Sequence, residues 1–197
     1  PVVNSGEITF QPPFRQHPEG LAYRIGPPAE KRVSLSRDNR HGILLDGKHT
    51  ITSGEVVIGG SAVVKLEGEA RARVIGGDSV TASGNAEVEV WAGEYIGLRG
   101  HATAITRGNS SVHLSGDARA TAFDGASVVA HGETVVSAVD RAKVVAGSGC
   151  RVLLGGDATV EAFGADVECD GRATVLARLC TRVTARGHST VFACDLA

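Results

Sequence analysis

An eight-residue repeat runs from Gly60 to Cys194. Seventeen consecutive octads follow the consensus G-x-A-x-V-x-A-x, and one of them, GADVECD at 164–170, is short by a single residue. Well-formed examples are GHATAITR (100–107) and GRATVLAR (171–178). So short a period, combined with small apolar residues and only 4% aromatics, favours a thin core made by stacking nearly identical units.

Each octad has the pattern of a β-strand followed by a turn. Small apolar residues alternate with variable ones, which is the period-2 signature of a strand. The fifth position holds Val or Ile in fourteen of the seventeen octads, and β-branched side chains suit a pleated, buried surface. The leading Gly, sometimes replaced by Asp or Ser, is placed for a turn with positive φ. A helix is excluded because the Gly spacing would interrupt it at every second turn.

The fourth octad position indicates how many octads make one coil. Every second octad gives a mostly hydroxyl-bearing set: Val63, Ser79, Tyr95, Ser111, Ser127, Lys143, Thr159, Thr174 and Thr190. The alternate octads give a mostly charged set: Arg71, Glu87, Thr103, Arg119, Val135, Arg151, Asp166 and Arg182. Three octads per coil would mix the two sets. We therefore predict two octads, or about 16 residues, per coil, with like positions stacked at about 4.8 Å in a rod on the order of 40 Å long.

The predicted fold is all-β: a parallel β-solenoid, or β-helix, over residues 60–197, preceded by an N-terminal cap over residues 1–59. The first 59 residues do not follow the octad. Four segments there have the pattern of strands or of imperfect first coils: 6–14, 31–36, 43–51 and 54–58. A cap is expected because the terminal coil of a solenoid otherwise exposes apolar side chains and unpaired backbone groups.

The tandem octads resemble those of parallel β-solenoid repeat proteins, in particular bacterial and phage sequences with tandem NATVxA-like octads. The resemblance covers about two thirds of the chain. It implies the fold without implying a particular function, because solenoids serve as adhesins, tail spikes, enzymes, ice binders and scaffolds alike.

Composition and charge argue against several partner classes. The formal net charge of −2 creates no field that would recruit nucleic acid or an anionic membrane, and no apolar stretch is long enough to span a bilayer. The seven His residues lack H-x-H or HExxH spacing and the four Cys lack CxxC spacing, so no metal and no cofactor is predicted.

The cysteines bear on location and on the core. Cys150 and Cys169 fall at inward octad positions. Cys180 and Cys194 fall at a corner in neighbouring octads, where a disulfide bond between them is geometrically possible. The absence of a disulfide pattern slightly favours a cytoplasmic location. A secreted or surface location stays open because the sequence starts at Pro1 rather than at Met.

Asp78 and Glu94 are the candidate catalytic residues. Both occupy the third octad position, where Ala is usual, and they lie sixteen residues apart. Two octads per coil would stack them with carboxyl groups roughly 5 Å apart, close to the separation in retaining glycosidases. Trp91 and Tyr95 are the candidate ligand-binding residues, since their rings could stack on a sugar. The alternative, which we favour, is that each acid follows a Gly and accepts backbone N–H bonds at a corner.

The hydroxyl-bearing face turns apolar toward its C-terminal end. The candidate partner surface comprises Val129, Val145, Leu176 and Phe192. An exposed apolar strip on a flat sheet suits contact with a protein partner or with a second copy of the chain. The residues two positions after each hydroxyl vary too much in size and polarity for the regular lattice match that ice binding needs. The charged face carries Arg residues that could meet an anionic polymer, but interspersed acids there are typical of a solvated surface.

Three functions are consistent with these observations. The first is a non-catalytic structural or binding module whose repetitive faces serve assembly or partner recognition. The second is a carbohydrate-active β-helix enzyme, with Asp78 and Glu94 as the acid pair and a polysaccharide as ligand. The third is a spacer or neutralising domain of a larger bacterial surface, phage-tail or toxin-related system. Octads without insertions leave little to build a pocket, so the sequence favours the first hypothesis over an enzyme.

Overall fold

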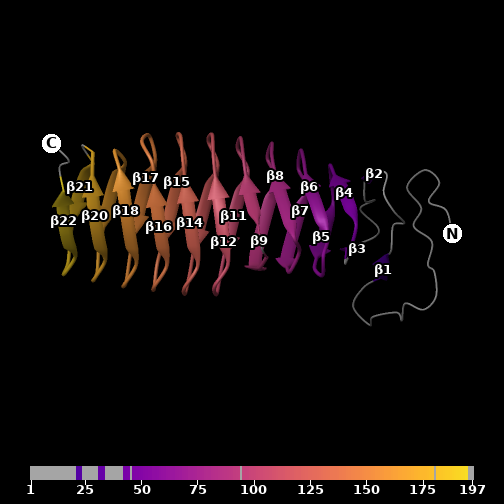
Figure 1. Ribbon diagram of the computed structural model, residues 1–197, viewed down its shortest axis with the longest axis horizontal. Coiled ribbons are helices and arrows are strands. Elements are labelled where there is room, and N and C mark those ends of the chain that lie inside the picture. Colours follow the sequence, from indigo (N-terminus) through magenta and orange to yellow (C-terminus); the bar gives the residue numbers. More distant parts are fainter. Residues whose placement is uncertain are drawn as a thin grey trace.

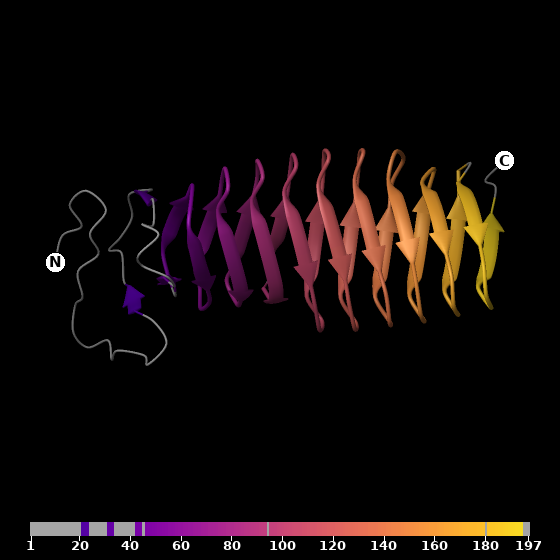
Figure 2. The ribbon, with the colours of Figure 1, turned by 180° about the vertical axis from the view of Figure 1, so that it is seen from behind.

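The computed structural model is a rod of stacked β-strands (Figures 1 and 2). It describes residues 21–23, 31–33, 42–44, 46–93, 95–179 and 181–194. The strands form two parallel sheets of eleven strands each. Within these ranges all the elements are strands, and no helix there is long and apolar enough to cross a membrane.

The chain alternates between the two sheets, so one sheet holds the odd-numbered strands and the other the even-numbered strands. The odd sheet comprises β1 (Leu21–Tyr23), β3 (Gly42–Leu44), β5 (Glu55–Ile58), β7 (Arg71–Ile75), β9 (Glu87–Ala92), β11 (Thr103–Thr106), β13 (Arg119–Ala122), β15 (Val135–Ala138), β17 (Arg151–Leu154), β19 (Asp166–Cys169) and β21 (Arg182–Ala185). The even sheet comprises β2 (Lys31–Val33), β4 (Lys48–Ile51), β6 (Val63–Leu66), β8 (Ser79–Ala82), β10 (Ile96–Leu98), β12 (Ser111–Leu114), β14 (Ser127–Ala130), β16 (Lys143–Ala146), β18 (Thr159–Phe163), β20 (Thr174–Arg178) and β22 (Thr190–Cys194).

The register confirms the predicted coil of about 16 residues. In the even sheet Ser111 pairs with Ser127 and Ser127 with Lys143, each sixteen residues on. In the odd sheet Arg71 pairs with Glu87 at the same step. The hydroxyl-bearing and charged sets identified from the sequence are therefore outward columns of two different sheets.

The short octad, at 164–170, shortens the pairing step by one residue at a single corner of the rod. Thr159 pairs with Thr174, fifteen residues on, and Arg151 pairs with Asp166 at the same shorter step. The next pair in the odd sheet, Asp166 and Arg182, returns to sixteen. The missing residue thus shortens the connection between β18 and β19, and both faces keep their columns aligned.

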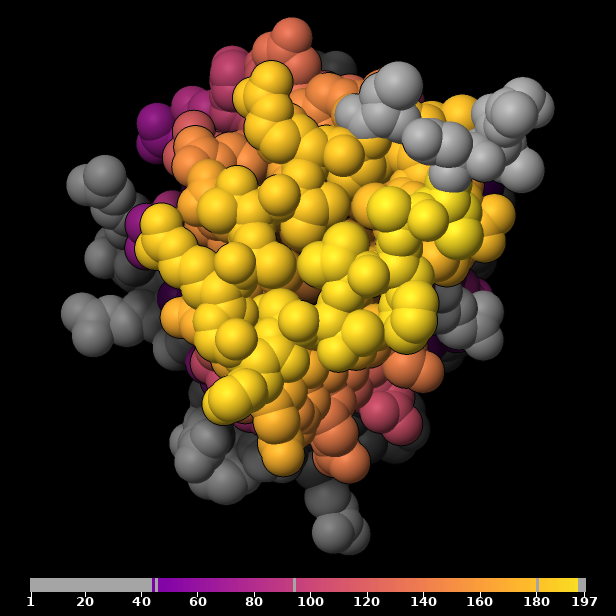
Figure 3. Space-filling view, turned by 90° about the vertical axis from the view of Figure 1, so that its left-hand side faces the viewer, coloured from indigo at the N-terminus to yellow at the C-terminus, as the bar shows by residue number. Residues whose placement is uncertain are grey.

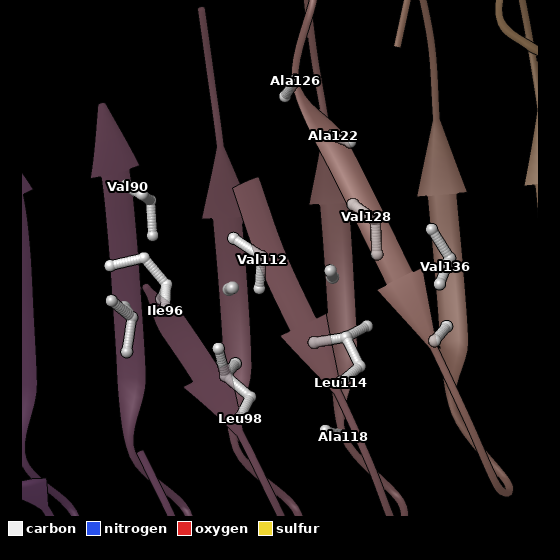
Figure 4. Packing of buried hydrophobic residues seen from close by; sticks show 14 of the residues in the cluster. Val90, Ile96, Leu98, Val112, Leu114, Ala118, Ala122, Ala126, Val128 and Val136 are labelled. Atoms are coloured by element: carbon white, nitrogen blue, oxygen red, sulfur yellow. The ribbon is translucent and has the colours of Figure 1, made fainter. Parts of the chain in front are cut away.

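The core lies between the two sheets. Inward and outward residues alternate along each strand, so that Val112 and Val128 are 0% exposed while their strand neighbours reach the surface. Figure 4 shows these two valines together with Leu114 in the space between the sheets. Full burial of a Val or Leu side chain stabilises the fold by about 2 kcal/mol relative to leaving it exposed. Stability is thus built from many small, similar contributions along the rod.

The cysteines follow the inward and outward pattern where they are described. Cys150 and Cys169 are buried free thiols, as the octad positions predicted, and Cys194 is an exposed free thiol. Cys180 lies outside the described residues, so its pairing stays open.

Most corners have a positive φ at the leading octad position. In the octads led by Gly76 and Ser148 the next residue, Gly77 or Gly149, has the positive φ instead, so the predicted role is wrong for Ser148. Gly171 has φ of 78°, and the residues at the same octad position in 124–131 and 140–147, Asp124 and Asp140, have φ of 57° and 59°. Asp is among the few residues other than Gly that are enriched in this region. The predicted role of the leading residue is confirmed at these corners.

Replacing Gly171 with Ala is expected to lower the free energy of unfolding by about 2 kcal/mol, because Ala is strained at this φ. Its Cβ would also lie 3.0 Å from the backbone N and 3.1 Å from the carbonyl O of Gly156 in the preceding coil. Chemical denaturation measures the loss. Gly155→Ala is the control, since a Cβ there meets only the side chain of Val139, at 3.4 Å. Equal losses in the two variants would contradict this account.

The rod extends to both ends of the described chain. Strands β4 and β5 pair with β6 and β7, so coiling is established before residue 60. The predicted strand at 6–14 lies outside the described residues, and the cap over residues 1–59 stays a prediction. Figure 3 looks onto the C-terminal end, where the last coil faces the viewer. Val191, which would be buried elsewhere in the rod, is 39% exposed there because no described coil covers β22.

Candidate functional site

The outward side of the even sheet, here called the even face, carries an apolar row. The pairing of β12 to β22 stacks six residues in consecutive coils: His113, Val129, Val145, Glu161, Leu176 and Phe192. Val145 is 37% exposed and Phe192 is 55% exposed, while Val129 and Leu176 are half-buried by their neighbours. The structure therefore places the four residues of the candidate partner surface in one line, interrupted by a single acid.

Tyr95 extends this row by one coil. Its ring stacks on His113 with centroids 5.3 Å apart and planes inclined by 27°. A Cβ on Gly97 would lie 3.2 Å from the Tyr95 ring, so Gly97 leaves the space that the ring covers. Tyr95 is 44% exposed. It therefore contributes an aromatic surface to the even face.

Glu161 is neutralised within its own chain. Its carboxylate forms an ion pair with the Arg178 guanidinium at 3.1 Å, and that guanidinium lies 5.7 Å from the centre of the Phe163 ring. The Arg178 Nε is buried without a hydrogen-bond partner among the described residues. The one acid in the apolar row is thus held by a neighbour, which reduces the cost of covering it.

Beside the apolar row runs a hydroxyl row, the fourth-position column of the even sheet. Its members with described pairing include Ser79, Ser111, Ser127, Lys143, Thr159, Thr174 and Thr190. Lys143 is the single charged side chain in this set. Apart from Lys143, the side chains of this set are short and uncharged.

The odd face, the outward side of the odd sheet, is charged but internally paired. Ion pairs join arginines to acids in adjacent coils: Arg71 to Glu87 at 3.0 Å, Arg73 to Glu89 at 3.1 Å, Arg151 to Glu168 at 2.8 Å and Arg182 to Asp166 at 3.8 Å. At a corner, Asp157 accepts two hydrogen bonds from Arg172, and this bonding, together with the carboxylate charge, raises the pKa of the guanidinium. Paired charges of this kind suit a solvated face and present little net field to an anionic polymer.

A shallow groove of about 620 Å³ lies on the odd face between its outward columns. Its walls include Arg71, Glu87, Arg73 and Glu89, which are already engaged in the ion pairs above, and Ile105, which is 43% exposed. The groove is open, and no group of three or more potential metal ligands occurs in the described part of the chain. Between the ion pairs its lining is apolar and includes Val88 and Ala104.

One edge of the odd face carries a cation between two aromatic rings. The Arg107 guanidinium lies 5.6 Å from the centre of the Trp91 ring and 4.8 Å from that of Phe123, and its Nε is 3.8 Å from Glu89. The backbone register shifts between Val74 and Ile75, which leaves Trp91 as an extra residue in β9. Sequence reasoning found Trp91 but missed its two neighbours, although all three occupy the eighth octad position at sixteen-residue spacing.

The predicted acid pair is described only in part. Glu94 lies outside the described residues, so the carboxyl separation stays a prediction. Asp78 is exposed, its backbone N–H donates to the carbonyl O of Ala62 at 3.2 Å, and its carboxylate has no hydrogen bond or ion pair with the described residues. Trp91 and Tyr95 contact different neighbours, Arg107 and His113 respectively, on two different faces.

Comparison of the chain with protein-family models, with curated proteins and with solved structures gives no match. The functional argument therefore rests on the chemistry of the two faces.

Proposed function

We propose that this protein is a non-catalytic binding module that associates with a second copy of itself through the even face. The observation that supports it is the apolar row, in which Val145 is 37% exposed although it is apolar and has a coil on either side. An apolar strip on a sheet, interrupted by one paired acid and bordered by hydroxyls, has the chemistry of a protein contact surface. Aromatic residues at both ends of the row, Tyr95 and Phe192, are of the kind that dominates interface energy.

The size of the even face fits a second copy of the chain. Eight coils, from β8 to β22, span roughly 38 Å at the strand spacing of parallel sheets, and a four-residue strand is roughly 13 Å long. The face then buries roughly 500 Å² on each copy, or about 1,000 Å² in total, which is at the lower limit for a specific interface. We expect a dimer that dissociates on dilution.

The odd face supports the same assignment by contrast. Most of its described arginines and acids, with Arg119 as an exception, are satisfied within one chain. Covering them would remove solvent from ion pairs without forming better ones. The odd face also exposes apolar side chains, namely Ile75, Trp91 and Ile105, but its many charged groups favour a solvated surface. The even face carries an apolar row with few charges.

The proposal includes kinship with the bacterial and phage solenoids that carry tandem octads. Its support is the seventeen-octad run in the sequence together with the sixteen-residue register. In such a system an elongated dimer would act as a spacer or as a partner-binding rod. The carbohydrate-active alternative has weaker support, because Asp78, Trp91 and Tyr95 are not among the residues that line the groove on the odd face.

Replacing Val145 with Glu is expected to raise the dissociation constant of the dimer by at least about 30-fold, because it brings an unpaired carboxylate into an apolar contact. Sedimentation velocity over a concentration series measures the change. Ile105→Glu is the matched control, since Ile105 is a similarly exposed aliphatic residue on the odd face, and its dissociation constant should equal that of the parent. A parent protein that is monomeric at all accessible concentrations would refute the proposal.

A further inference from the structure

We infer that the two copies pack with their rods antiparallel, about a twofold axis that follows the strand direction between Val129 and Val145. This inference rests on the self-association proposed above and specifies its geometry. It is carried by the order of side chains along the even face, which forms a self-complementary series about that axis.

Two identical sheets that meet face to face can be related by a twofold axis along the rod or by one along the strands. An axis along the strands keeps each column opposite itself and reverses the order of the coils. The apolar row of one copy then lies over the apolar row of the other, in the opposite direction. The position of the axis along the row then determines which coils of the two copies face each other.

An axis between β14 and β16 lies at the middle of the eight strands from β8 to β22. Val129 then faces Val145 of the other copy, so two aliphatic pairs form the centre. His113 faces Glu161 one coil further out on each side. Beyond these, the Tyr95 ring, which covers Gly97, faces Leu176. In the outermost pair, Thr81 faces Phe192. Apolar groups thus meet apolar groups at all but this last pair, and the single acid of the row meets the single imidazole.

The hydroxyl row is also compatible with this axis. Lys143 faces Ser127 of the other copy, and Ser111 faces Thr159, so hydroxyls surround the lysine. Among the described residues of the even face, the only like-charged pair that this axis creates is Arg99 with Arg178. These two residues lie at a corner of the coil, and Arg178 is already paired with Glu161 at 3.1 Å. The charge pattern therefore permits the contact along its whole length.

Two other arrangements create conflicts that this one avoids. An axis through Val145 would place Lys143 opposite Lys143 and would cover Glu161 with Val129. An axis along the rod that keeps the apolar row over itself would place Glu161 opposite Glu161. Like charges opposed across an interface cost several kcal/mol, so these arrangements are disfavoured against the antiparallel one.

The test is a charge exchange between His113 and Glu161. Within one chain these residues are three coils apart, roughly 14 Å at the strand spacing, which is beyond direct contact. A coupling between them must therefore arise across the interface. We expect His113→Glu and Glu161→Lys each to raise the dissociation constant about tenfold, and the double variant to return it to within about threefold of the parent value. Sedimentation velocity at fixed salt provides the constants.

The control is the pair His131→Glu and Glu161→Lys. His131 lies at an even-face corner and faces Gly147 across the proposed axis, so this double variant should show no recovery. All substituted side chains point outward, and circular dichroism verifies that each variant keeps its fold. A parent dimer with additive effects of His113→Glu and Glu161→Lys would overturn the antiparallel register and leave self-association standing, as would equal recovery in the control. A monomeric parent would overturn both.

Discussion

Replacing Val128 with Asp is expected to abolish folding of the rod, whereas the same change at its neighbour Val129 should leave the rod folded and prevent self-association. Val128 is 0% exposed between the sheets, and Val129 lies on the even face. A carboxylate at position 128 would be buried without a partner, which costs at least about 4 kcal/mol. This cost is a large fraction of the free energy of unfolding of an ordinary domain. At position 129 the carboxylate reaches water in the monomer.

Circular dichroism and sedimentation velocity on the two variants decide this prediction. The Val128→Asp protein should lose its strand signal or accumulate as aggregate, while the Val129→Asp protein should keep the parent spectrum and sediment as a monomer. The two substitutions are identical in chemistry and adjacent in sequence, so the difference isolates the direction in which the side chain points. Folded Val128→Asp protein with parent stability would show that the alternation of faces is wrong.

Truncating Leu114 to Ala is expected to lower the free energy of unfolding by about 3 kcal/mol, because it removes three methyl or methylene equivalents from a packed interior and leaves a cavity. Leu114 is 1% exposed and lies in the core shown in Figure 4. The opposed sheet is held by its own hydrogen bonds and cannot move in to fill the space. Urea denaturation at one fixed protein concentration measures the loss without a contribution from changes in dimer population.

The control for Leu114 is Ile105→Ala on the odd face. Ile105 is 43% exposed, so its truncation should cost less than about 1 kcal/mol. Because each coil contacts only its neighbours, the loss at Leu114 can also appear as a broader unfolding transition, in which coils near the site separate first. A loss at Leu114 no larger than that at Ile105 would contradict the position of the core.

The amino-acid sequence was sufficient for the architecture. The alternation within each octad predicts a strand with one buried side, and the separate chemistry of two interleaved sets predicts two octads per coil. Both predictions agree with the register, in which Ser111 pairs with Ser127 and Arg71 with Glu87. The physical reason is that a solenoid converts a sequence period directly into a spatial neighbour. A residue and the one sixteen positions later must lie side by side, so the period alone predicts which residues form a column.

The tertiary structure was needed wherever side-chain reach or an irregular backbone decides the contact. Trp91 and Tyr95 are four residues apart, yet one lies beside Arg107 on the odd face and the other covers Gly97 on the even face. A register shift in β9 sets the first position, and the missing side chain of Gly97 permits the second. Likewise, the sequence indicates that acids interrupt the arginines of the charged face, but only the fold shows which of them pair: Arg71, Arg73 and Arg151 bond acids in neighbouring coils. Period determines which residues are neighbours, while rotamers, corners and bulges determine which neighbours touch.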